Sequence, residues 1–250
     1  DQNRGGAGGF HAGVKFAVNL PVDWIWMSDD DAIPQAGCLV TLLTYATSQN
    51  NVYGSTAIVK DSSNGELCWP AFRLDKFGRR AFPNAEKHDE LDAIQEVTMI
   101  PFLGFMVSRK MAQEVGPPNT NYFISGDDVE YGIRMQAAGA KLYQIRDSTV
   151  IHPRIPHYHV KFLWKRRSCI RMDAWRRYFD VRNRIWNAWL RTGYLGALAT
   201  TGAMLLRLIF TLVCEKNRLS QISAYLRGMR DGLFYFGKSE NRPAILSKYQ

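Results

Sequence analysis

The chain has 250 residues and a mass of 28.5 kDa, enough for one large domain, or a domain with an appendage, around a substantial buried core. Apolar residues make up 46% and charged residues 22%, and these fractions exclude a disordered tail, a collagen-like fibre and a small disulfide scaffold. The net charge of +9 is uneven, because residues 1–153 carry −5 and residues 154–250 carry +14. The charge pattern predicts two electrostatically different regions that meet near Pro153.

Strand-like and helix-like segments alternate through residues 1–153, and this alternation predicts an α/β layered domain. Short apolar runs are expected as strands, and apolar residues at three- and four-residue spacing as helices. In chain order the sequence predicts a helix over 10–20, a strand over 23–27, a helix over 37–47, a strand over 52–59, mostly loop over 61–96, a strand over 102–108, a helix over 109–115, a turn over 116–119, a helix from Asp127 to Gly139, and two strands ending at Ile151.

The basic region has a different character. Residues 157–191 are rich in Arg and in aromatic residues at helical spacing, and they are predicted as an amphipathic helix with a basic polar face. Residues 193–214 contain one charge, Arg207, and are long enough to cross a bilayer. The central Arg207, together with several glycines and threonines, favours a buried or interfacial helix over a membrane span. The four cysteines are widely spaced and contain no C-x-x-C pair, so we expect buried free thiols in a reducing compartment.

Three consecutive aspartates follow the predicted strand over 23–27. In extended chain, residues i and i+2 point the same way, so Asp29 and Asp31 are expected to project together. Two converging carboxylates repel unless a cation lies between them, and oxygen ligands favour Mg²⁺ or Mn²⁺ completed by substrate phosphates. The alternative is an acidic loop or helix cap, because Asp is common in turns.

Three further features could carry chemistry. The glycine cluster at Gly5–Phe10 lies at the start of a predicted helix, where backbone N–H groups could approach an anion. Its spacing matches neither a dinucleotide fingerprint nor a P-loop. The alternative is a tight turn. Asp127 is expected to be the N-cap of the next helix, in a capping box with Glu130, and Asp128 to be a fixed carboxylate that could act as a general base. His152 closes a strand, as a metal ligand or as a hydrogen-bonded structural residue.

In this order and spacing, the motifs resemble the family 2 glycosyltransferases of the GT-A fold, and within them the galactofuranosyltransferase and rhamnosyltransferase branch. The resemblance covers roughly residues 1–153 and rests on N-x-G-G-A-G-G-F from Asn3, on Ser28–Asp31, on Gly104, on D-D-x-E-Y-G-x-R from Asp127, and on His152. It implies an α/β, Rossmann-like nucleotide-diphospho-sugar transferase core over 1–153 that lacks its first β-α-β unit because an upstream part is missing. Residues 154–250 would then form a basic, aromatic-rich, helical membrane-associating region.

The resemblance also implies roles for individual residues. Asp31 would be the direct ligand of Mn²⁺ or Mg²⁺, Asp29 would bind the metal or the donor ribose, and His152 would complete the protein ligands. Asp128 would be the catalytic base of a single, inverting displacement. The donor pocket would be lined by Asn3, Gly5, Gly6, Gly8 and Gly9, and the acceptor side by Phe105 and Asp127.

The expected function is transfer of galactofuranose or rhamnose from a UDP- or dTDP-linked donor to a lipid-linked or cell-surface glycan. Gly104 is followed by Phe105-Met106, where galactofuranosyltransferases carry paired tryptophans, and this keeps rhamnose open. Because basic and aromatic residues suit an anionic headgroup layer, we expect a peripheral protein on the cytoplasmic face of the bacterial inner membrane. The alternative is a non-catalytic basic protein that binds membranes or nucleic acid. No nucleic-acid partner is expected, because no such module is recognisable and the motifs lie in the acidic half.

Overall fold

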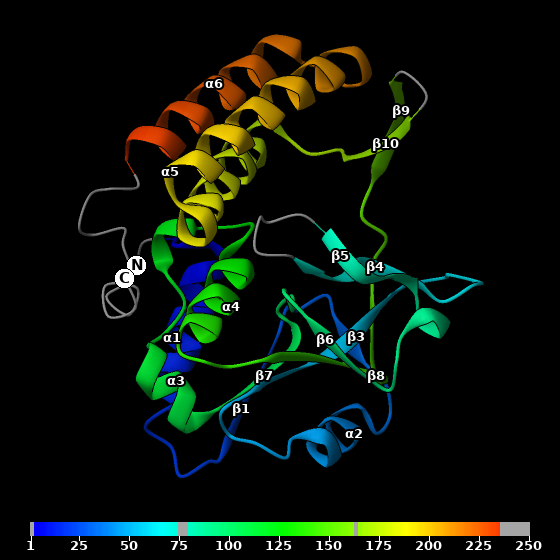
Figure 1. Ribbon diagram of the computed structural model, residues 1–250, viewed down its shortest axis with the longest axis vertical. Helices are drawn as coiled ribbons and strands as arrows, with labels where there is room; N and C mark the ends of the chain where they lie inside the picture. Colours follow the sequence, from blue (N-terminus) through cyan, green and yellow to red (C-terminus); the bar gives the residue numbers. More distant parts are fainter. Residues whose placement is uncertain (1–2, 75–79, 163–164, 236–250) are drawn as a thin grey trace. The chain divides into compact units, whose positions relative to one another are not determined.

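The computed structural model describes residues 3–74, 80–162 and 165–235 (Figure 1). These residues divide into two compact units. Unit 1 comprises residues 3–120 and 128–154, and unit 2 comprises residues 121–127 and 155–235. The chain therefore leaves unit 1 once for a seven-residue loop and returns to it at Asp128.

Unit 1 is built on a mixed β-sheet to which, among the described residues, eight strands contribute. Its helices are α1 (Gly5–Ala17), α2 (Cys38–Tyr45), α3 (Arg109–Val115) and α4 (Asp127–Ala137). Its strands are β1 (Trp24–Ser28), β2 (Ile33–Pro34), β3 (Val52–Val59), β4 (Glu66–Leu74), β5 (Arg80–Lys87), β6 (Ile94–Val97), β7 (Leu103–Ser108) and β8 (Leu142–His152). Short 3-10 turns lie at His88–Glu90 and Thr120–Tyr122.

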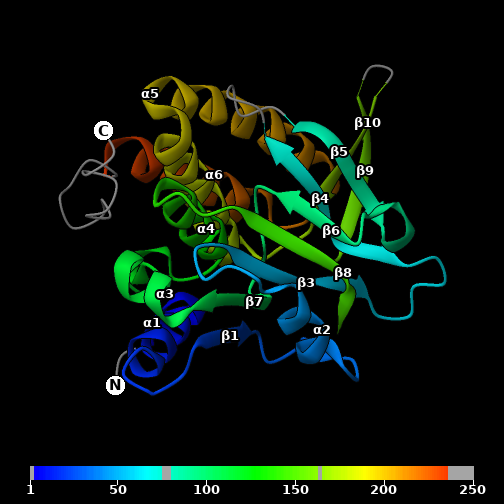
Figure 2. The same cartoon turned by 60° about the horizontal axis from the view of Figure 1, so that its bottom comes forward.

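The strands follow the order β1-β7-β3-β4-β5, and β8 lies beside β3 and β6 (Figure 2). The short strand β2 also pairs with β8. The β3–β8 pair is parallel and the other pairs are antiparallel. All six residues of β7 are buried, as expected for a central strand that is covered on both faces. Helix α2 packs on β3 and β8, α1 on β1, and α3 on β7.

Most predicted elements of unit 1 are confirmed, including the strands at 23–27, 52–59 and 102–108 and the helices at 37–47 and 109–115. The loop predicted over 61–96 is wrong, because its described part contains β4, β5 and β6; residues 75–79 lie outside the described part of the chain. The two strands predicted before Ile151 are one strand, β8, whose register against β3 shifts between Ser55 and Thr56. Helix α1 begins at Gly5, so the glycine cluster lies inside the helix.

Unit 2 consists of a hairpin, β9 (His157–Phe162) and β10 (Lys165–Ile170), followed by α5 (Ala174–Cys214) and α6 (Arg218–Phe234). The helix predicted over 157–191 is therefore wrong for its first part, which forms the hairpin. Helix α5 breaks at Gly193, where φ is +68° and ψ is −158°. We call the two arms α5a (residues 174–192) and α5b (residues 194–214). One apolar cluster joins α5a, α5b and α6 through Val181, Ile185, Ala197, Met204, Tyr225 and Met229.

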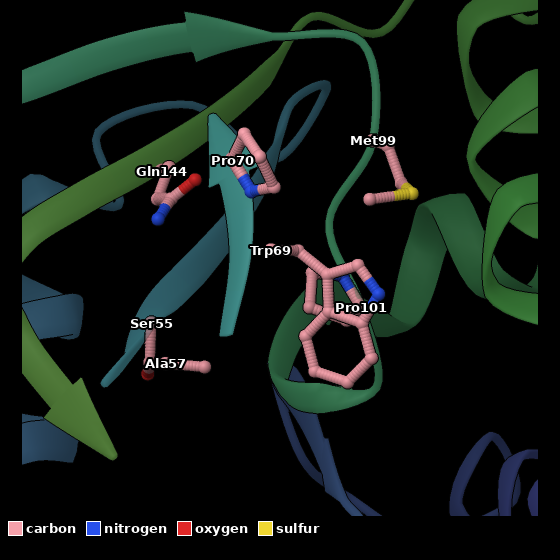
Figure 3. A pocket seen from close by; sticks show the side chains of 7 residues that line it. All are labelled: Ser55, Ala57, Trp69, Pro70, Met99, Pro101 and Gln144. Carbon is pink, nitrogen blue, oxygen red and sulfur yellow. The ribbon is translucent and has the colours of Figure 1, made fainter. Parts of the chain in front are cut away.

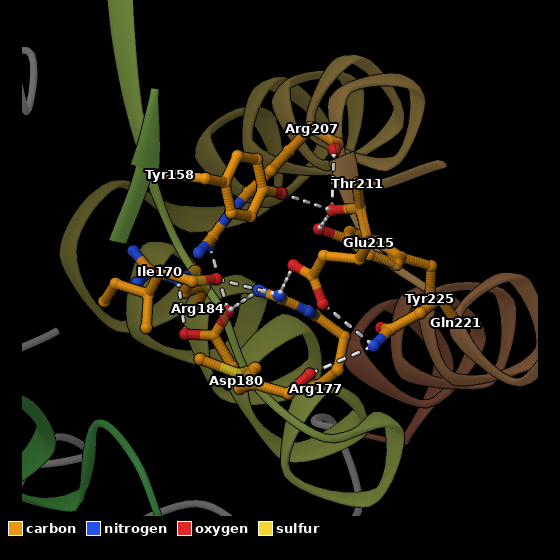
Figure 4. Close-up of polar contacts among 11 residues, drawn as sticks. Tyr158, Ile170, Arg177, Asp180, Arg184, Arg207, Thr211, Glu215, Gln221 and Tyr225 are labelled. Carbon is orange, nitrogen blue, oxygen red and sulfur yellow. Dashed lines mark hydrogen bonds and ion pairs between the residues drawn. The ribbon is translucent and has the colours of Figure 1, made fainter. Parts of the chain in front are cut away.

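A buried ionic network also ties α5a to α5b (Figure 4). Asp180 accepts from Arg184 Nε at 2.8 Å and from Arg207 Nη1 at 2.9 Å. Arg177, which is fully buried, donates to Glu215 Oε1 at 2.8 Å. Burial alone would raise the pKa of Asp180, but Arg184, Arg207 and Arg177 together hold that pKa below its usual range. The single charge of the apolar stretch thus points into unit 2.

The four cysteines are free thiols. Cys38, Cys68 and Cys169 are buried, as predicted, and Cys214 is half-buried. Cys38 Sγ lies 3.4 Å from Ser55 Oγ and 3.3 Å from Ser148 Oγ, in the core between α2 and the sheet. These thiols therefore contribute to packing.

Candidate active site

The three aspartates follow β1 in a turn. The backbone N–H of Asp29 donates to the Phe102 carbonyl at 2.8 Å, and the N–H of Ala32 returns to the Asp29 carbonyl at 3.3 Å. The chain is therefore not extended here, and the alternation argument for Asp29 and Asp31 is wrong. The sheet, and not local alternation, decides where these carboxylates lie.

Strand pairing brings Asp31 to His152. Directly after the turn, β2 pairs with the end of β8, with Ile33 opposite Ile151. Asp31 Oδ1 consequently lies 3.4 Å from His152 Nε2, across more than a hundred residues of chain. The Asp31 side chain is half exposed and that of His152 is almost buried, so the pair faces solvent from the Asp31 side.

The proton on His152 is fixed by a backbone carbonyl. His152 Nδ1 lies 2.7 Å from the Pro153 oxygen, and because a carbonyl only accepts, Nδ1 carries the hydrogen. In the neutral ring, Nε2 then presents a lone pair to the Asp31 carboxylate. Two acceptors at this distance need a proton or a cation between them, and a histidine that donates its other N–H to a carbonyl is the usual arrangement of a metal ligand.

Asp29 adds a third charge nearby. Partial withdrawal from water, followed by the neighbouring carboxylates of Asp31 and Asp30, raises the pKa of Asp29 to about 6, while His152 acts in the opposite direction. The hydroxyl of Ser28 is shielded from solvent and has no hydrogen-bond partner among the described residues. The end of β1 therefore carries unneutralised negative charge and an unused polar group.

These residues fit a cation that is shared with a substrate. Among the residues that the structure describes, no three His, Cys, Asp or Glu side chains converge closely enough to enclose a metal ion. Asp31 and His152 offer two ligands, and Asp29 is close enough to them to be influenced by both. Mg²⁺ and Mn²⁺ typically take only a few protein ligands and complete their shells with phosphate oxygens and water.

Sequence reasoning missed Trp69, which borders this site. Its ring meets the His152 ring edge-on, with 5.5 Å between centroids. Trp69 also lines a small pocket in unit 1, together with Ser55, Ala57, Pro70, Met99, Pro101 and Gln144 (Figure 3). Trp69 and Pro70 lie within residues 61–96, which were predicted as loop, and Met99 lies just after them. The sequence could have indicated Trp69 only if β4 had been predicted, because that strand brings its ring to His152.

Phe102 connects the other motifs to the aspartate turn. Its carbonyl holds Asp29, and its ring lies 4.3 Å from Phe10 of α1 and 6.0 Å from Tyr131 of α4. Tyr131 lies one turn from Asp128 on the same helix. The glycine helix, the aspartate turn and the helix that carries Asp128 therefore meet at one aromatic residue.

The glycine cluster has a definite local structure. The Asn3 Oδ1 atom accepts the N–H of Gly5, the first residue of α1, at 2.8 Å. A Cβ on Gly8 would lie 2.3 Å from Arg4 Cβ, whereas Gly6 and Gly9 face open space. The donor-pocket role of Asn3, Gly5, Gly6, Gly8 and Gly9 stays a prediction.

Two predictions about α4 and β7 need correction. Helix α4 begins at Asp127, so Asp127 is its first residue and not its N-cap. Both carboxylate oxygens of Glu130 accept from Arg134. Asp127 is buried and Asp128 is half-buried. Phe105 is fully buried, with its ring 5.6 Å from Tyr131, so it belongs to the core and does not reach an acceptor in this structure.

Residues 2–175 match the family described as "Glycosyltransferase like family 2", and the chain belongs to this family. The match extends beyond the stretch 1–153 over which the sequence motifs were recognised, and reaches the start of α5.

The particular relatives are galactofuranosyltransferases. The chain is 29% identical to the galactofuranosyltransferase GlfT1 of Mycobacterium tuberculosis over 195 residues, which cover 73% of this chain and 60% of the relative. It is also 29% identical over 158 residues to the protein of the same name from Mycolicibacterium smegmatis, covering 61% of this chain and 51% of the relative. The chain therefore spans between about half and three fifths of these relatives.

A solved structure shares the fold. The crystal structure of GalNAc-T7 with UDP, GalNAc and Mn²⁺ matches the whole of this chain and 45% of its own, with a TM-score of 0.53 and 12% sequence identity. At this identity the likeness concerns the fold alone. The predicted α/β GT-A architecture, followed by a helical C-terminal region, is confirmed.

Proposed function

We propose that this protein is a metal-dependent, inverting glycosyltransferase that moves galactofuranose or rhamnose from a UDP- or dTDP-linked donor to a lipid-linked or cell-surface glycan. The observation that carries the proposal is the pair Asp31–His152, with Nε2 of the ring turned to the carboxylate and Nδ1–H committed to the Pro153 carbonyl. Membership of the glycosyltransferase family and the galactofuranosyltransferase relatives support the same reaction class.

Donor binding is assigned to the aspartate turn and the glycine helix. Asp31 and His152 would hold Mn²⁺ or Mg²⁺, with Asp29 as a third ligand or a partner of the ribose. When bound, such a cation would supply positive charge to offset the charge that grows on the departing nucleoside diphosphate. Asn3 and the glycines after it line the donor pocket, where N–H groups at the start of α1 suit phosphate oxygens.

Acceptor activation is assigned to Asp128. Its carboxylate takes the proton of the acceptor hydroxyl while that oxygen bonds to the anomeric carbon, and the bond from this carbon to the diphosphate oxygen breaks. The electron pair leaves with the diphosphate and the proton remains on Asp128. One displacement from the opposite face inverts the anomeric centre. Asp128 lies in the first turn of α4, where its Oδ1 accepts the backbone N–H of Val129 at 2.7 Å.

The catalytic assignment is tested with the full-length protein. Asp31→Ala is expected to abolish Mn²⁺-dependent binding of UDP or dTDP in a calorimetric titration, and to abolish transfer from UDP-galactofuranose or dTDP-rhamnose. Asp30→Asn is the matched control, since Asp30 is an exposed neighbour in the same turn. Unchanged transfer by Asp31→Ala would refute the proposal. If the wild-type protein bound no nucleotide but bound RNA or liposomes, the alternative of a non-catalytic basic protein would be favoured.

We assign residues 1–153 to the catalytic core and residues 154–250 to a membrane surface. The membrane assignment is based on the exposed face of α5b. Helix α5 is long and apolar enough to cross a membrane, judged by length and composition, and 22% of its apolar window is buried. One face of α5b, about 140° wide at 100° per residue, is exposed and uncharged. It consists of Tyr194, Leu195, Leu198, Ala199, Gly202, Leu205, Leu206, Ile209 and Val213.

The polarity of α5b is the reverse of that expected for a helix in water. Its single charge, Arg207, points inward to Asp180, and its outward face is apolar, with Leu195 79% and Val213 70% exposed. The helix packs on α6, which exposes Arg218, Arg227 and Arg230. Moving these charges into the hydrocarbon layer would cost several kcal/mol. This supports a helix that lies in the plane of an anionic membrane, on its cytoplasmic face, and does not cross it.

The membrane assignment has its own test. The full-length protein is expected to float with vesicles containing phosphatidylglycerol and less with vesicles of phosphatidylcholine alone. Ile209→Glu places a charge on the apolar face and is expected to abolish flotation. Val40→Glu is the matched control, because Val40 is a similarly exposed β-branched residue on α2 of unit 1. Equal flotation of both variants would contradict the assignment.

A further inference from the structure

The loop that precedes Asp128 is held by side chains of α5a. Asn183 Nδ2 donates to the carbonyl oxygens of Tyr122, Ile124 and Ser125 at 2.9, 3.0 and 2.7 Å. Asn187 Nδ2 donates to the Gly126 carbonyl at 3.0 Å, and Asn187 Oδ1 accepts from the Tyr122 hydroxyl at 2.8 Å. Two asparagines four residues apart on one helix face therefore bind four residues of the loop 121–126.

The loop has a backbone that it would not adopt unaided. The φ angle is +61° at Phe123, +69° at Ser125 and +81° at Gly126. Left-handed conformations are rare for residues with a Cβ, and above all for bulky ones such as phenylalanine, so they persist only where surrounding contacts impose them. The carbonyls that Asn183 gathers flank these positions, and this arrangement supplies the required constraint.

The contacts are well shielded from water. Asn183 is 1% exposed, and Asn187 and Arg182 are each 8% exposed. Arg182 adds hydrogen bonds to the carbonyls of Asn121 and Tyr122, and its guanidinium lies 4.2 Å from the Trp186 ring centroid. On the loop side, a Cβ at Gly126 would lie 3.0 Å from Asn187 Nδ2, so glycine permits this close approach. Low exposure strengthens these hydrogen bonds and makes each of them costly to lose.

The chain runs from this loop directly into α4. Gly126 is followed by Asp127 and then by Asp128, at which the chain re-enters unit 1. Only Asp127 separates Gly126 from Asp128, so the backbone angles at Ser125 and Gly126 lead directly into the first turn of α4. A base displaced by about 1 Å can lose on the order of 10²-fold in rate.

We propose that Asn183, together with Asn187, is a positioning residue for the acceptor-activating carboxylate: the two amides fix the left-handed loop 121–126 and thereby the start of α4. The inference rests on the proposed role of Asp128 as the base. It assigns to unit 2 a part in catalysis in addition to membrane attachment. It also gives a reason for the polar residues on a helix face that packs inward.

The test compares Asn183→Asp, which keeps shape but loses the two N–H donors, with Asn19→Asp. Asn19 likewise donates its amide to a backbone carbonyl, that of Lys15, but on the exposed end of α1. In the full-length protein, Asn183→Asp is expected to lower kcat 10- to 100-fold, with KM for the nucleotide sugar and Mn²⁺-dependent nucleotide binding within twofold of wild type. Amide hydrogen exchange over residues 121–128 should rise, while exchange in β7 stays unchanged. Asn19→Asp should change none of these quantities.

A second variant approaches the same contact from the loop. Gly126→Ala strains the positive φ and crowds Asn187 Nδ2, so it is expected to give the same drop in kcat with intact nucleotide binding. This variant keeps the test decisive if Asn183→Asp does not fold. Variants that transfer sugar at the wild-type rate would overturn the inference while leaving the proposed function intact. A wild-type protein that transfers no sugar would instead overturn the proposed function, on which the inference rests.

Discussion

The environment of an aspartate differs in sign between the two units. In unit 1, Asp29 lies beside other carboxylates, and partial burial together with Asp31 and Asp30 raises its pKa to about 6. In unit 2, Asp180 is buried deeper, yet Arg184, Arg207 and Arg177 hold its pKa below the usual range. Three guanidiniums offset the charge of Asp180, whereas among the described groups that act on Asp29 only His152 lowers its pKa. The difference separates an ionic group that stabilises the fold from one arranged for a ligand.

The same contrast holds for the polar helix residues near the unit boundary. In α4, Glu130 and Arg134 are buried and bind each other, and Arg134 also donates to the carbonyls of Val115 and Pro117. That cluster closes within unit 1. In α5a, Asn183 and Asn187 donate hydrogen bonds to a loop about 60 residues upstream. Unit 1 thus carries the proposed reactive groups, and unit 2 holds the segment that leads to one of them.

The largest expected effect separates the proposed base, Asp128, from an exposed aspartate of the same unit, Asp30. Asp128→Asn removes the proton acceptor but keeps the shape of the side chain, so sugar transfer should fall by about 10²- to 10⁴-fold. Steady-state transfer by the full-length protein measures this loss, and nucleotide titration checks that donor binding survives. Asp30→Asn should retain wild-type transfer. Equal losses in both variants would show that general charge, and not a positioned base, matters in unit 1.

A comparable effect, on stability and not on rate, is expected in unit 2. Asp180→Asn leaves three arginines without their shared carboxylate, and the free energy of unfolding should fall by about 3–5 kcal/mol. Denaturant titration measures the loss, with Asp173→Asn, an exposed residue just before α5, as the control. A loss below 1 kcal/mol would mean that the network does not stabilise unit 2.

The pH dependence of that loss has a defined sign. The pKa of Asp180 is lowered in the folded protein, so its contribution is present above the unfolded pKa of about 3.9 and disappears as the pH falls through the folded value. The difference in unfolding free energy between wild type and Asp180→Asn should therefore be constant from pH 5 to pH 8 and shrink below pH 4. A difference that grew on acidification would contradict the assignment.

What the sequence predicted depends on how local the signal was. Buried strands such as β3 and β7 and the short helices α2 and α3 carry their own periodicity and were predicted correctly. Strand β4 was missed because Pro70 and scattered charges break its alternation, and β9 because its basic residues resemble a polar helix face. The approach of Asp31 to His152 requires β2 to pair with β8, and no local pattern predicted this pairing. The family resemblance implied only that the two side chains hold the same cation. The bonds of Asn183 to residues 122–125 have no sequence signal, because an asparagine on a helix ordinarily faces water.

Glycine substitutions compare how tightly the two units are packed. Gly104 in β7 has φ +102°, and a Cβ there would lie 2.5 Å from Ser55 Oγ, whereas Gly193 in α5 has φ +68° and open space around it. Alanine strains the backbone at both positions by about 1–3 kcal/mol. At Gly104 the steric overlap adds about 1–3 kcal/mol. Denaturant titration of Gly104→Ala and Gly193→Ala should show the larger loss for Gly104, and a reversed order would mean that the sheet relaxes around the new methyl group.

The smallest expected effect has the opposite sign to that of Asp180→Asn. Asp29→Asn removes a carboxylate that Asp31 and Asp30 repel, so in metal-free buffer at pH 7 the free energy of unfolding should stay constant or rise slightly. The same variant should weaken Mn²⁺-dependent nucleotide binding, since Asp29 is proposed as a third ligand of the cation or as a partner of the donor ribose. Asp30→Asn, which removes an exposed charge, is the control for both measurements. If Asp29→Asn destabilised the protein as Asp180→Asn does, Asp29 would have a stabilising partner, and the end of β1 would be a structural ion pair like that of unit 2.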